Sequence, residues 1–326
     1  MNEERARIFL PFSLLIAILA VSTASIFIRF AQREAPSLVI AALRLTFASL
    51  ALAPIALSRH RDELRALTRR EWLLGLLSGM LLAVHFATWI SSLEYTSVAS
   101  SVVLVSTGPL WVALLSPIFL KEPLTKAVLM GMTLALLGGT VIGLSDSCTL
   151  EWPPWPGQDG RYALQATRPS ISCPPLSEFV QGKAFLGNFL ALAGAWAVAG
   201  YLLIGRRLRG GMTLVPYIFI VYGIAAVALV GIMLAAGQHP TGFSPTTYVY
   251  ILLLALVPQL IGHSTYNWAL RYLPAALVSI TTLGEPIGSA ILAYFILREA
   301  PTPLTIFGGL LILAGIFVSS RGERQV

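Results

Sequence analysis

Ten apolar runs of about 20 residues, separated by short polar segments, dominate the chain. They are Ile8–Ile28, Leu38–Leu57, Leu73–Ser92, Ala99–Leu120, Leu124–Leu144, Ala184–Ile204, Leu214–Ala236, Tyr248–Leu270, Ala275–Leu297 and Leu304–Ser320. A run of this length matches the hydrocarbon thickness that one α-helix crosses. The strands of a membrane barrel would instead give segments of about ten residues with alternating polarity. The pattern therefore predicts an all-α integral membrane protein with ten transmembrane helices.

The composition agrees with a chain that lies in a membrane. Of its 326 residues, 56% are hydrophobic and only 11% are charged, and the mean hydropathy is +0.78. An ordinary soluble domain carries roughly 25% charged residues, so these charges are too few to cover a water-soluble globule. The same numbers exclude a disordered chain and a disulfide-dense secreted scaffold. The net charge of +7 does not indicate nucleic-acid binding, because the arginines form short clusters between apolar runs.

The distribution of basic residues predicts how the helices are oriented. With both termini in the cytoplasm, the inside segments hold about 15 Lys and Arg residues and the outside segments about 6. Half of the outside ones lie in a single long loop, which contributes little to orientation. We therefore expect the N-terminus and the C-terminus inside, in a multi-pass protein of the cell (inner) membrane.

The sequence repeats itself at a separation of 177 positions. Leu93–Ala99 aligns with Leu270–Ala276, and Leu120–Thr125 aligns with Leu297–Thr302. Small and kink-forming residues coincide as well: Gly108-Pro109 with Glu285-Pro286, and Gly131 and Gly138 with Gly308 and Gly315. Each copy holds five spans, an odd number, so the second copy starts on the opposite side of the membrane. The repeat therefore predicts two inverted five-helix halves, an architecture found in many secondary transporters with the substrate site near the midplane.

The second copy carries motifs of a known family. Leu283–Ile287, Tyr294–Glu299 and Gly308–Gly315 resemble the end of an EamA repeat, the building block of the drug/metabolite transporter (DMT) superfamily. Ala42–Leu45 resembles the second helix of the family's first repeat, and the resemblance covers nearly the whole chain in two copies. It implies transport of a small solute, with export as the direction, and it leaves the solute unspecified.

The repeat and the resemblance together divide the chain into three parts. We expect the first EamA repeat, with transmembrane helices 1 to 5, at residues 1–145 and the second, with helices 6 to 10, at residues 184–326. Between them, residues 146–183 form an extracytoplasmic loop that departs from the short linker expected in this family. Both cysteines of the chain, Cys148 and Cys173, fall in this loop.

Two cysteines in one loop of an oxidising compartment predict a disulfide, which stabilises a chain by roughly 3 kcal/mol for a loop of this size. The alternative is a pair of free thiols. We expect no metal at this position, because two thiols do not supply four ligands and no histidine lies nearby.

Polar residues within the apolar runs indicate a substrate site. Gln259, His263, Tyr266 and Asn267 are spaced i, i+4, i+7 and i+8, which places them on a single face of one helix. A polar face inside a membrane lines a cavity or bonds to a neighbouring helix. We predict cavity lining, because these residue types suit a small polar or zwitterionic solute. The residues predicted to bind substrate are His85, Trp89, Trp196, Gln259, His263, Tyr266 and Asn267.

Two charged residues lie deep in the predicted spans, and we expect them to couple transport to protons. Glu285 falls about 15 Å from either end of its helix, immediately before Pro286, so a kink is expected there. Arg44 lies about 9 Å inside the second span. Charges at this depth are costly and usually functional. The alternatives are a glutamate that ties the kink to a neighbouring helix and an arginine whose side chain reaches outward to the interface.

The sequence thus predicts a secondary active transporter that works by alternating access on an amino acid-like or other small polar or amphipathic solute. Alternatives are a passive channel or facilitator and a membrane-embedded sensor. We expect no enzyme, since no catalytic motif of a soluble enzyme is present, and no cofactor. The expected partners are the small-molecule substrate and the lipid bilayer, with the proton as coupling ion and no nucleic acid. Both a monomer and a homodimer are compatible with the sequence.

Overall fold

The computed structural model describes residues 3–119, 126–147, 149–151, 170–172, 182–273 and 275–323. The first half of the chain forms α1 (Glu3–Ser22), α2 (Ala24–Ala31), α3 (Ser37–Arg59), α4 (Arg61–Arg65), α5 (Arg69–Ser92), α6 (Val98–Val105), α7 (Gly108–Phe119) and α8 (Lys126–Ser147). The second half forms α10 (Lys183–Arg209), α11 (Leu214–Ala235), α12 (Pro245–Leu254), the π-helix η1 (Ala255–His263), α13 (Ser264–Ala269), α14 (Ala275–Thr281), α15 (Gly284–Leu292), the π-helix η2 (Ala293–Leu297) and α16 (Pro303–Glu323). Two short strands, β1 (Thr149–Glu151) and β2 (Ser170–Ser172), pair antiparallel between the halves.

Each of the ten predicted apolar runs is mainly helical where the structure describes it, with short interruptions in some of them. Within the described ranges, seven helical stretches are long and apolar enough to cross a membrane. Three shorter apolar helices, Leu129–Ile142, Gly284–Leu297 and Pro303–Gly315, account for the other predicted runs. The prediction of an all-helical membrane protein is confirmed at this level.

The distribution of side chains is the inverse of that in a water-soluble protein. Large apolar side chains are exposed around the outside of the bundle, among them Phe12, Val227 and Phe295. Polar side chains that would face water in a soluble protein are buried inside, including Arg44 and Asn267. Lipid solvates the apolar exterior, whereas polar groups in the interior need partners from neighbouring helices.

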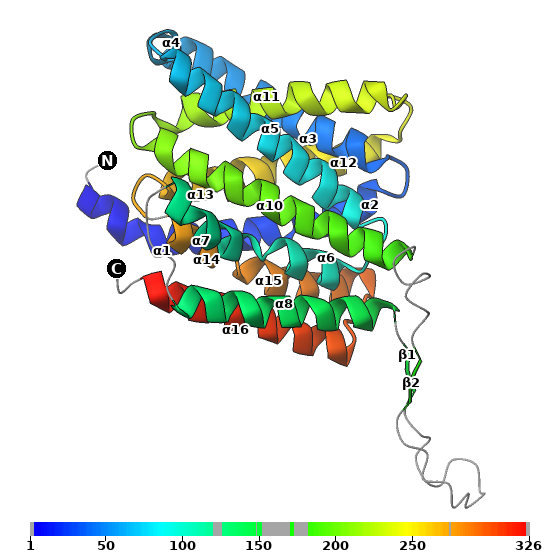
Figure 1. Cartoon of the computed structure of the whole chain (residues 1–326). Coiled ribbons are helices and arrows are strands. Elements are labelled where there is room, and N and C mark those ends of the chain that lie inside the picture. The colour runs from blue at the N-terminus through cyan, green and yellow to red at the C-terminus, as the bar shows by residue number, and fades with distance from the viewer. Residues whose placement is uncertain are drawn as a thin grey trace, which may run out of the picture.

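The last helices of the two halves pack against each other through glycines that the repeat aligns. Helix α8, the last of the first half, lies antiparallel beside α16, the last of the second half (Figure 1). A Cβ at Gly138 would lie 2.5 Å from the carbonyl oxygen of Gly308, and one at Gly308 would lie 2.7 Å from that of Gly138. Gly131 and Gly315 oppose each other in the same way. These four glycines let the helix backbones touch, so any larger side chain there would separate α8 from α16.

Several helices are interrupted within the bundle. Helices α6 and α7 are separated at Ser106–Thr107, and α14 and α15 are separated at Thr282–Leu283. The sequence predicted a kink at Glu285-Pro286. The structure instead has a break just before this dipeptide, because α14 ends at Thr281 and α15 begins at Gly284. Pro286 lies in the first turn of α15, where its missing N–H removes no helical hydrogen bond.

Different structural elements lie at the two ends of the bundle. Helix α1 begins and α16 ends at the same end, where the short helix α4 also lies (Figure 1). Strands β1 and β2 extend from the opposite end. The arginine-rich segment around α4 and the strands β1 and β2 are thus at opposite ends of the molecule.

Candidate functional site

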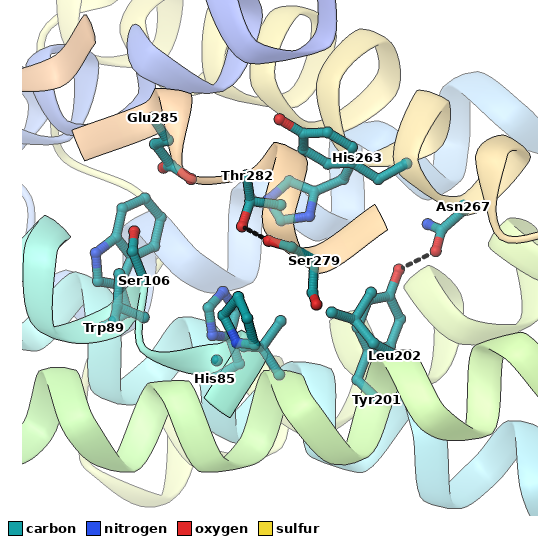
Figure 2. A pocket seen from close by; sticks show the side chains of 15 residues that line it. His85, Trp89, Ser106, Tyr201, Leu202, His263, Asn267, Ser279, Thr282 and Glu285 are labelled. Atoms are coloured by element: carbon teal, nitrogen blue, oxygen red, sulfur yellow. Dashed lines mark hydrogen bonds between the residues drawn. The ribbon is translucent and has the colours of Figure 1, made fainter. Parts of the chain in front are cut away.

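A cavity lies where the two helix interruptions meet in the centre of the bundle (Figure 2). The α6–α7 interruption contributes Ser106, Gly108 and Pro109, and the α14–α15 interruption contributes Thr282 and Glu285. The remaining lining residues come from α5, α6, α10, η1, α13 and α14: His85, Trp89, Val105, Val198, Tyr201, Leu202, His263, Tyr266, Asn267 and Ser279. Both halves therefore build the cavity, and they do so with corresponding elements.

Aromatic rings form one wall of the cavity. The rings of His85 and Trp89 on α5 are stacked with centroids 5.9 Å apart, and His263 lies edge-on to His85 at 6.4 Å. His85 Nδ1 is 2.9 Å from the carbonyl oxygen of Gly194. A carbonyl only accepts hydrogen bonds, so Nδ1 carries the proton, and Nε2 of the neutral ring is an acceptor. This wall provides flat apolar surface and a hydrogen-bond acceptor.

A hydrogen-bonded network forms the opposite side of the cavity. The Tyr201 hydroxyl donates to Oδ1 of Asn267 at 2.7 Å, and the Asn267 amide donates to the Tyr222 hydroxyl at 3.2 Å. The Tyr222 hydroxyl is also 3.3 Å from the Ser264 hydroxyl. Since these side chains are buried and bonded to one another, they hold α10, α11 and α13 in a fixed arrangement around the cavity.

Glu285 and Arg44 lie at different depths relative to the cavity. Glu285 lines the cavity at the first turn of α15 and is partly exposed to it. Arg44 is fully buried in α3, outside the lining. Its Nε donates to Oε1 of Gln259 at 3.0 Å, and its guanidinium carbon lies 4.1 Å from the centre of the Phe86 ring.

Several buried donors in and beside the cavity have no partner among the described residues. They are Trp89 Nε1, the Tyr266 hydroxyl, both terminal nitrogens of Arg44 and Nε2 of Gln259. Buried donors are normally satisfied, so unpaired ones concentrated around a cavity indicate room for an acceptor from outside the chain.

The structure brings together most of the residues that the sequence predicted to bind substrate. His85, Trp89, His263, Tyr266 and Asn267 line the cavity, while Gln259 turns away to Arg44. Trp196 lies elsewhere. Its ring contacts Trp111 and Phe189 with centroids 5.5 and 6.1 Å apart, and it is 41% exposed on the outside of α10. The predicted cysteine pair, Cys148 and Cys173, lies outside the described residues.

Sequence reasoning missed the hydroxyl residues of the cavity. Ser106, Ser279 and Thr282 line it, yet serine and threonine in apolar helices usually bond to their own backbone. Thr282 does so, since its hydroxyl donates to the Ser279 carbonyl at 2.6 Å. Their positions beside Gly108-Pro109 and Glu285-Pro286, which the repeat aligns, are the signal that points to them.

The free volume of the cavity is about 60 Å³. Since one water molecule needs about 10–15 Å³ in this measure, there is room for roughly four to six. An amino-acid-sized solute does not fit in this conformation. Binding such a solute therefore requires the surrounding helices to move apart.

Comparison with known proteins identifies the fold and its family. The profile of the EamA-like transporter family matches residues 9–144 and again residues 185–321. The chain belongs to this family. The resemblance seen in the sequence is thus confirmed, and the protein is a multi-pass membrane transporter of the EamA type within the DMT superfamily.

Relatives of this EamA-type transporter are similar at modest identity. An "Uncharacterized transporter" of Archaeoglobus fulgidus is 23% identical over 260 residues, 78% of each chain. A "Probable terminal-alkyne amino-acid exporter" of Streptantibioticus cattleyicolor is 26% identical over 231 residues, which cover 68% of this chain and 65% of that one. A solved crystal structure matches 96% of this chain and 97% of its own with a TM-score of 0.63 at 18% identity. At that identity the structural likeness concerns the fold alone.

Proposed function

We propose that the protein is a secondary active exporter of small amino acid-like solutes, built from ten transmembrane helices in two inverted repeats with both termini in the cytoplasm. The observation that carries this proposal is the central cavity. Two interrupted helices line it, one from each half, and their interruptions lie within one residue of the repeat separation of 177. Transporters with inverted repeats commonly bind their solute between the halves at such interruptions.

Contacts at one end of the bundle support alternating access as the mechanism. Arg29, in α2, donates to the Leu93 carbonyl at 2.5 Å and to the Thr96 carbonyl at 3.0 Å. It also forms an ion pair with Oε1 of Glu299 at 2.8 Å, and Oε2 of Glu299 accepts the Val98 N–H at 2.9 Å. Glu299 belongs to the second repeat and the other four residues to the first. We call this set of contacts the Arg29 latch. It closes the end of the cavity nearest β1 and β2.

The repeat supplies a counterpart to the Arg29 latch at the other end. Arg206 lies 177 positions after Arg29, and it donates to the carbonyl of Leu270, which lies 177 positions after Leu93, at 2.6 Å. The acid that corresponds to Glu299 is Glu122, which lies outside the described residues. Arg206 and Leu270 both belong to the second repeat, as Arg29 and Leu93 both belong to the first, and both arginine contacts are formed in this structure. Of these contacts, the ones made by Glu299 join the two halves, so we infer that they are the contacts that break when the β1–β2 end opens.

Glu285 is our candidate for proton coupling. It is a carboxylate at the cavity wall, so it can hold either a proton or the amine of a solute. If the two compete for this group, each outward-moving solute is exchanged for an inward-moving proton. The positive charge of Arg44 would favour the ionised carboxylate, because an opposite charge stabilises the charged form, and would so help Glu285 to release its proton.

The proposed division of the chain is residues 1–145, 146–183 and 184–326, with the middle part outside the cell. The pairing of Thr149 with Ser172 supports a disulfide in that part, because these residues adjoin Cys148 and Cys173. Cysteine labelling tests the orientation. Arg65→Cys should be protected from an impermeant reagent in intact cells, whereas a cysteine at Gln158 should react, and the opposite result would reverse the topology.

Transport by the full chain in proteoliposomes tests the function. A thermal-shift screen against amino acids, nucleosides and cationic drugs first selects solutes, because a ligand of the folded state raises the melting temperature. Labelled solute is then added outside vesicles that contain, or lack, the same unlabelled solute. A carrier takes up label faster when solute is present inside, whereas a channel shows no such stimulation. Flux equal to that of empty liposomes for every selected solute would contradict the proposal.

A further inference from the structure

Two side-chain donors hold the end of α5 at the β1–β2 end of the bundle. Arg29 donates to the Leu93 carbonyl at 2.5 Å, and Gln32 donates to the Ile90 carbonyl at 2.9 Å. The last carbonyls of an α-helix have no partner within the helix, so these donors cap α5. The two donors are three residues apart, and so are the two carbonyls that they hold.

An equivalent pair of donors lies at the other end of the bundle, where α4 lies and which we call the α4 end (Figure 1). Arg206 donates to the Leu270 carbonyl at 2.6 Å, and Nε of Arg209 donates to the Asn267 carbonyl at 3.0 Å. Each of these four residues lies 177 positions after its counterpart at the β1–β2 end. Here the donors belong to α10 and hold the end of α13.

The contacts at the α4 end join helices that pack with different partners. Helix α10 packs mainly against α5, and also against α6 and α7, whereas α13 and the preceding η1 pack against α1. The two arginines therefore hold two groups of helices together, although α10 and α13 belong to the same repeat. Both groups contribute residues to the lining of the cavity.

The side chains behind these contacts differ between the two ends. The side chain of Asn267 lines the cavity, accepts a hydrogen bond from the Tyr201 hydroxyl at 2.7 Å and donates to the Tyr222 hydroxyl at 3.2 Å (Figure 2). Their counterparts in the first repeat are all buried and apolar: Ile90, Ala24 and Leu45. Since apolar residues fit these positions in the first repeat, the fold itself does not require the polar network.

Asn267 takes part in the cavity wall and in the contact at the α4 end. Its amide oxygen is bonded to Tyr201 of α10, and its backbone carbonyl is held by Arg209 of the same helix. Tyr201 and Asn267 both line the cavity, so a solute that lies between them separates the two side chains. Such a separation also pulls the Asn267 carbonyl away from Arg209, because both bonds join the same residue to α10.

We propose that Asn267 is a positioning residue for transport, through which the cavity controls closure of the α4 end. The arginines hold α13 while Tyr201 and Asn267 meet, and a solute that lies between these two side chains keeps this end open. Closure follows once the solute has left this part of the cavity. The inference rests on the proposed transport function and adds the residue that links solute position to closure.

Cysteine labelling of the full chain tests this link. Ser106, which lines the cavity, is changed to cysteine in a protein whose two native cysteines are replaced by serine. The rate of its reaction with an impermeant thiol reagent is measured from the α4 end in oriented vesicles. Tyr201→Phe keeps the ring and removes the bond to Asn267, and Arg209→Met removes the donor to its carbonyl. Each should raise the rate about fivefold, the effect of losing one buried hydrogen bond.

The double variant distinguishes a link from two separate contacts. If Asn267 joins the two bonds, Tyr201→Phe with Arg209→Met should label only about fivefold faster than the parent, because either change alone releases α13. A rate equal to the product of the two single effects, about 25-fold, would show that the bonds act independently and would overturn the link. Labelling of Tyr201→Phe at the parent rate would overturn it as well.

Tyr250→Phe is the matched control, because its ring stacks on Phe30 and it lies outside the cavity lining. It should label at the parent rate, and an increase equal to that of Tyr201→Phe would contradict the proposal. Should Tyr201→Phe fail to fold, Asn267→Ile removes the same bond by introducing the residue that the first repeat has at this position. It should give the same fivefold increase, and the parent rate would again overturn the link.

Labelling requires no solute, so its result is independent of the proposed transport function. Variants that label as expected, in a protein that carries no solute into proteoliposomes, would contradict the proposed function and leave the link intact. Variants that label like the parent, in a protein that does carry solute, would remove the link and leave the carrier.

Discussion

Weakening the Arg29 latch should shift the transporter toward the conformation that is open at the β1–β2 end. Glu299→Gln keeps the shape of the side chain and removes the charge, so the ion pair with Arg29 is lost while one acceptor oxygen remains. The two side chains are 25% and 32% exposed, so solvent screens part of their attraction. The pair is therefore expected to contribute about 1 kcal/mol to the closed state, toward the upper limit for an exposed pair. A loss of about 1 kcal/mol changes a conformational equilibrium about fivefold.

A cysteine in the cavity wall reports this shift. Ser106→Cys is introduced into a parent protein in which serine replaces both Cys148 and Cys173. The rate at which this cysteine reacts with an impermeant thiol reagent is then measured from each side of oriented vesicles. Glu299→Gln should raise the rate from the β1–β2 side about fivefold and lower it from the other side.

Glu94→Gln is the matched control for this experiment. Glu94 lies near the same end of the bundle and accepts the backbone N–H of Ser37 at 3.1 Å. Both residues belong to the first repeat, so this substitution removes a charge without weakening a contact between the halves. Equal labelling rates for Glu299→Gln, Glu94→Gln and the parent protein would refute the latch and leave the ion pair as a surface contact.

Three further predictions concern coupling, pH and the loop. Glu285→Gln should abolish uptake driven by a pH gradient in proteoliposomes while solute exchange continues, and gradient-driven uptake at the wild-type rate would remove Glu285 from the coupling step. Burial raises the pKa of Glu63, in α4 outside the membrane spans, but hydrogen bonds from Thr213 at 2.5 and 2.7 Å outweigh it and leave the pKa below 4.5. The ionised Glu63 carboxylate therefore stabilises the folded protein above pH 4.5, and this contribution is lost as the pH falls through the lowered pKa. Glu63→Gln should lower the melting temperature by about 2 °C at pH 7 and scarcely change it at pH 3. Cys148 and Cys173 should resist alkylation until a reductant is added, and thiols that react without reductant in protein from an oxidising compartment would contradict the disulfide.

Features that depend on the lipid environment were predictable from the sequence. Each apolar run is helical because a backbone in hydrocarbon must satisfy its own hydrogen bonds. That prediction needs no knowledge of how side chains meet across the bundle. The contact of α8 with α16 was not predicted, although the glycines that the repeat aligns form it, since glycine lets two backbones approach closely.

The composition of the site was predicted only in part, because it depends on helix geometry that the sequence pattern does not reveal. The spacing of Gln259, His263, Tyr266 and Asn267 assumes an α-helix, yet residues 255–263 form a π-helix with a wider turn. The wider turn displaces Gln259 from the shared face, and it bonds to Arg44 instead of lining the cavity. Trp196 lies outside the cavity for a different reason. Its position within a predicted span does not reveal whether the side chain points inward or toward lipid.

The two halves carry equivalent contacts near the ends of the bundle and different residues at the central cavity. Arg29 and Leu93 correspond to Arg206 and Leu270, and each arginine donates to its own leucine carbonyl. If each half in turn takes the conformation of the other, the contacts that close the two ends must be equivalent, or one state would dominate. The cavity has no such requirement, because a single solute binds there in one orientation. Glu285 opposite Gly108 gives the cavity a carboxylate from one repeat only, so the amine of the proposed solute has one defined partner.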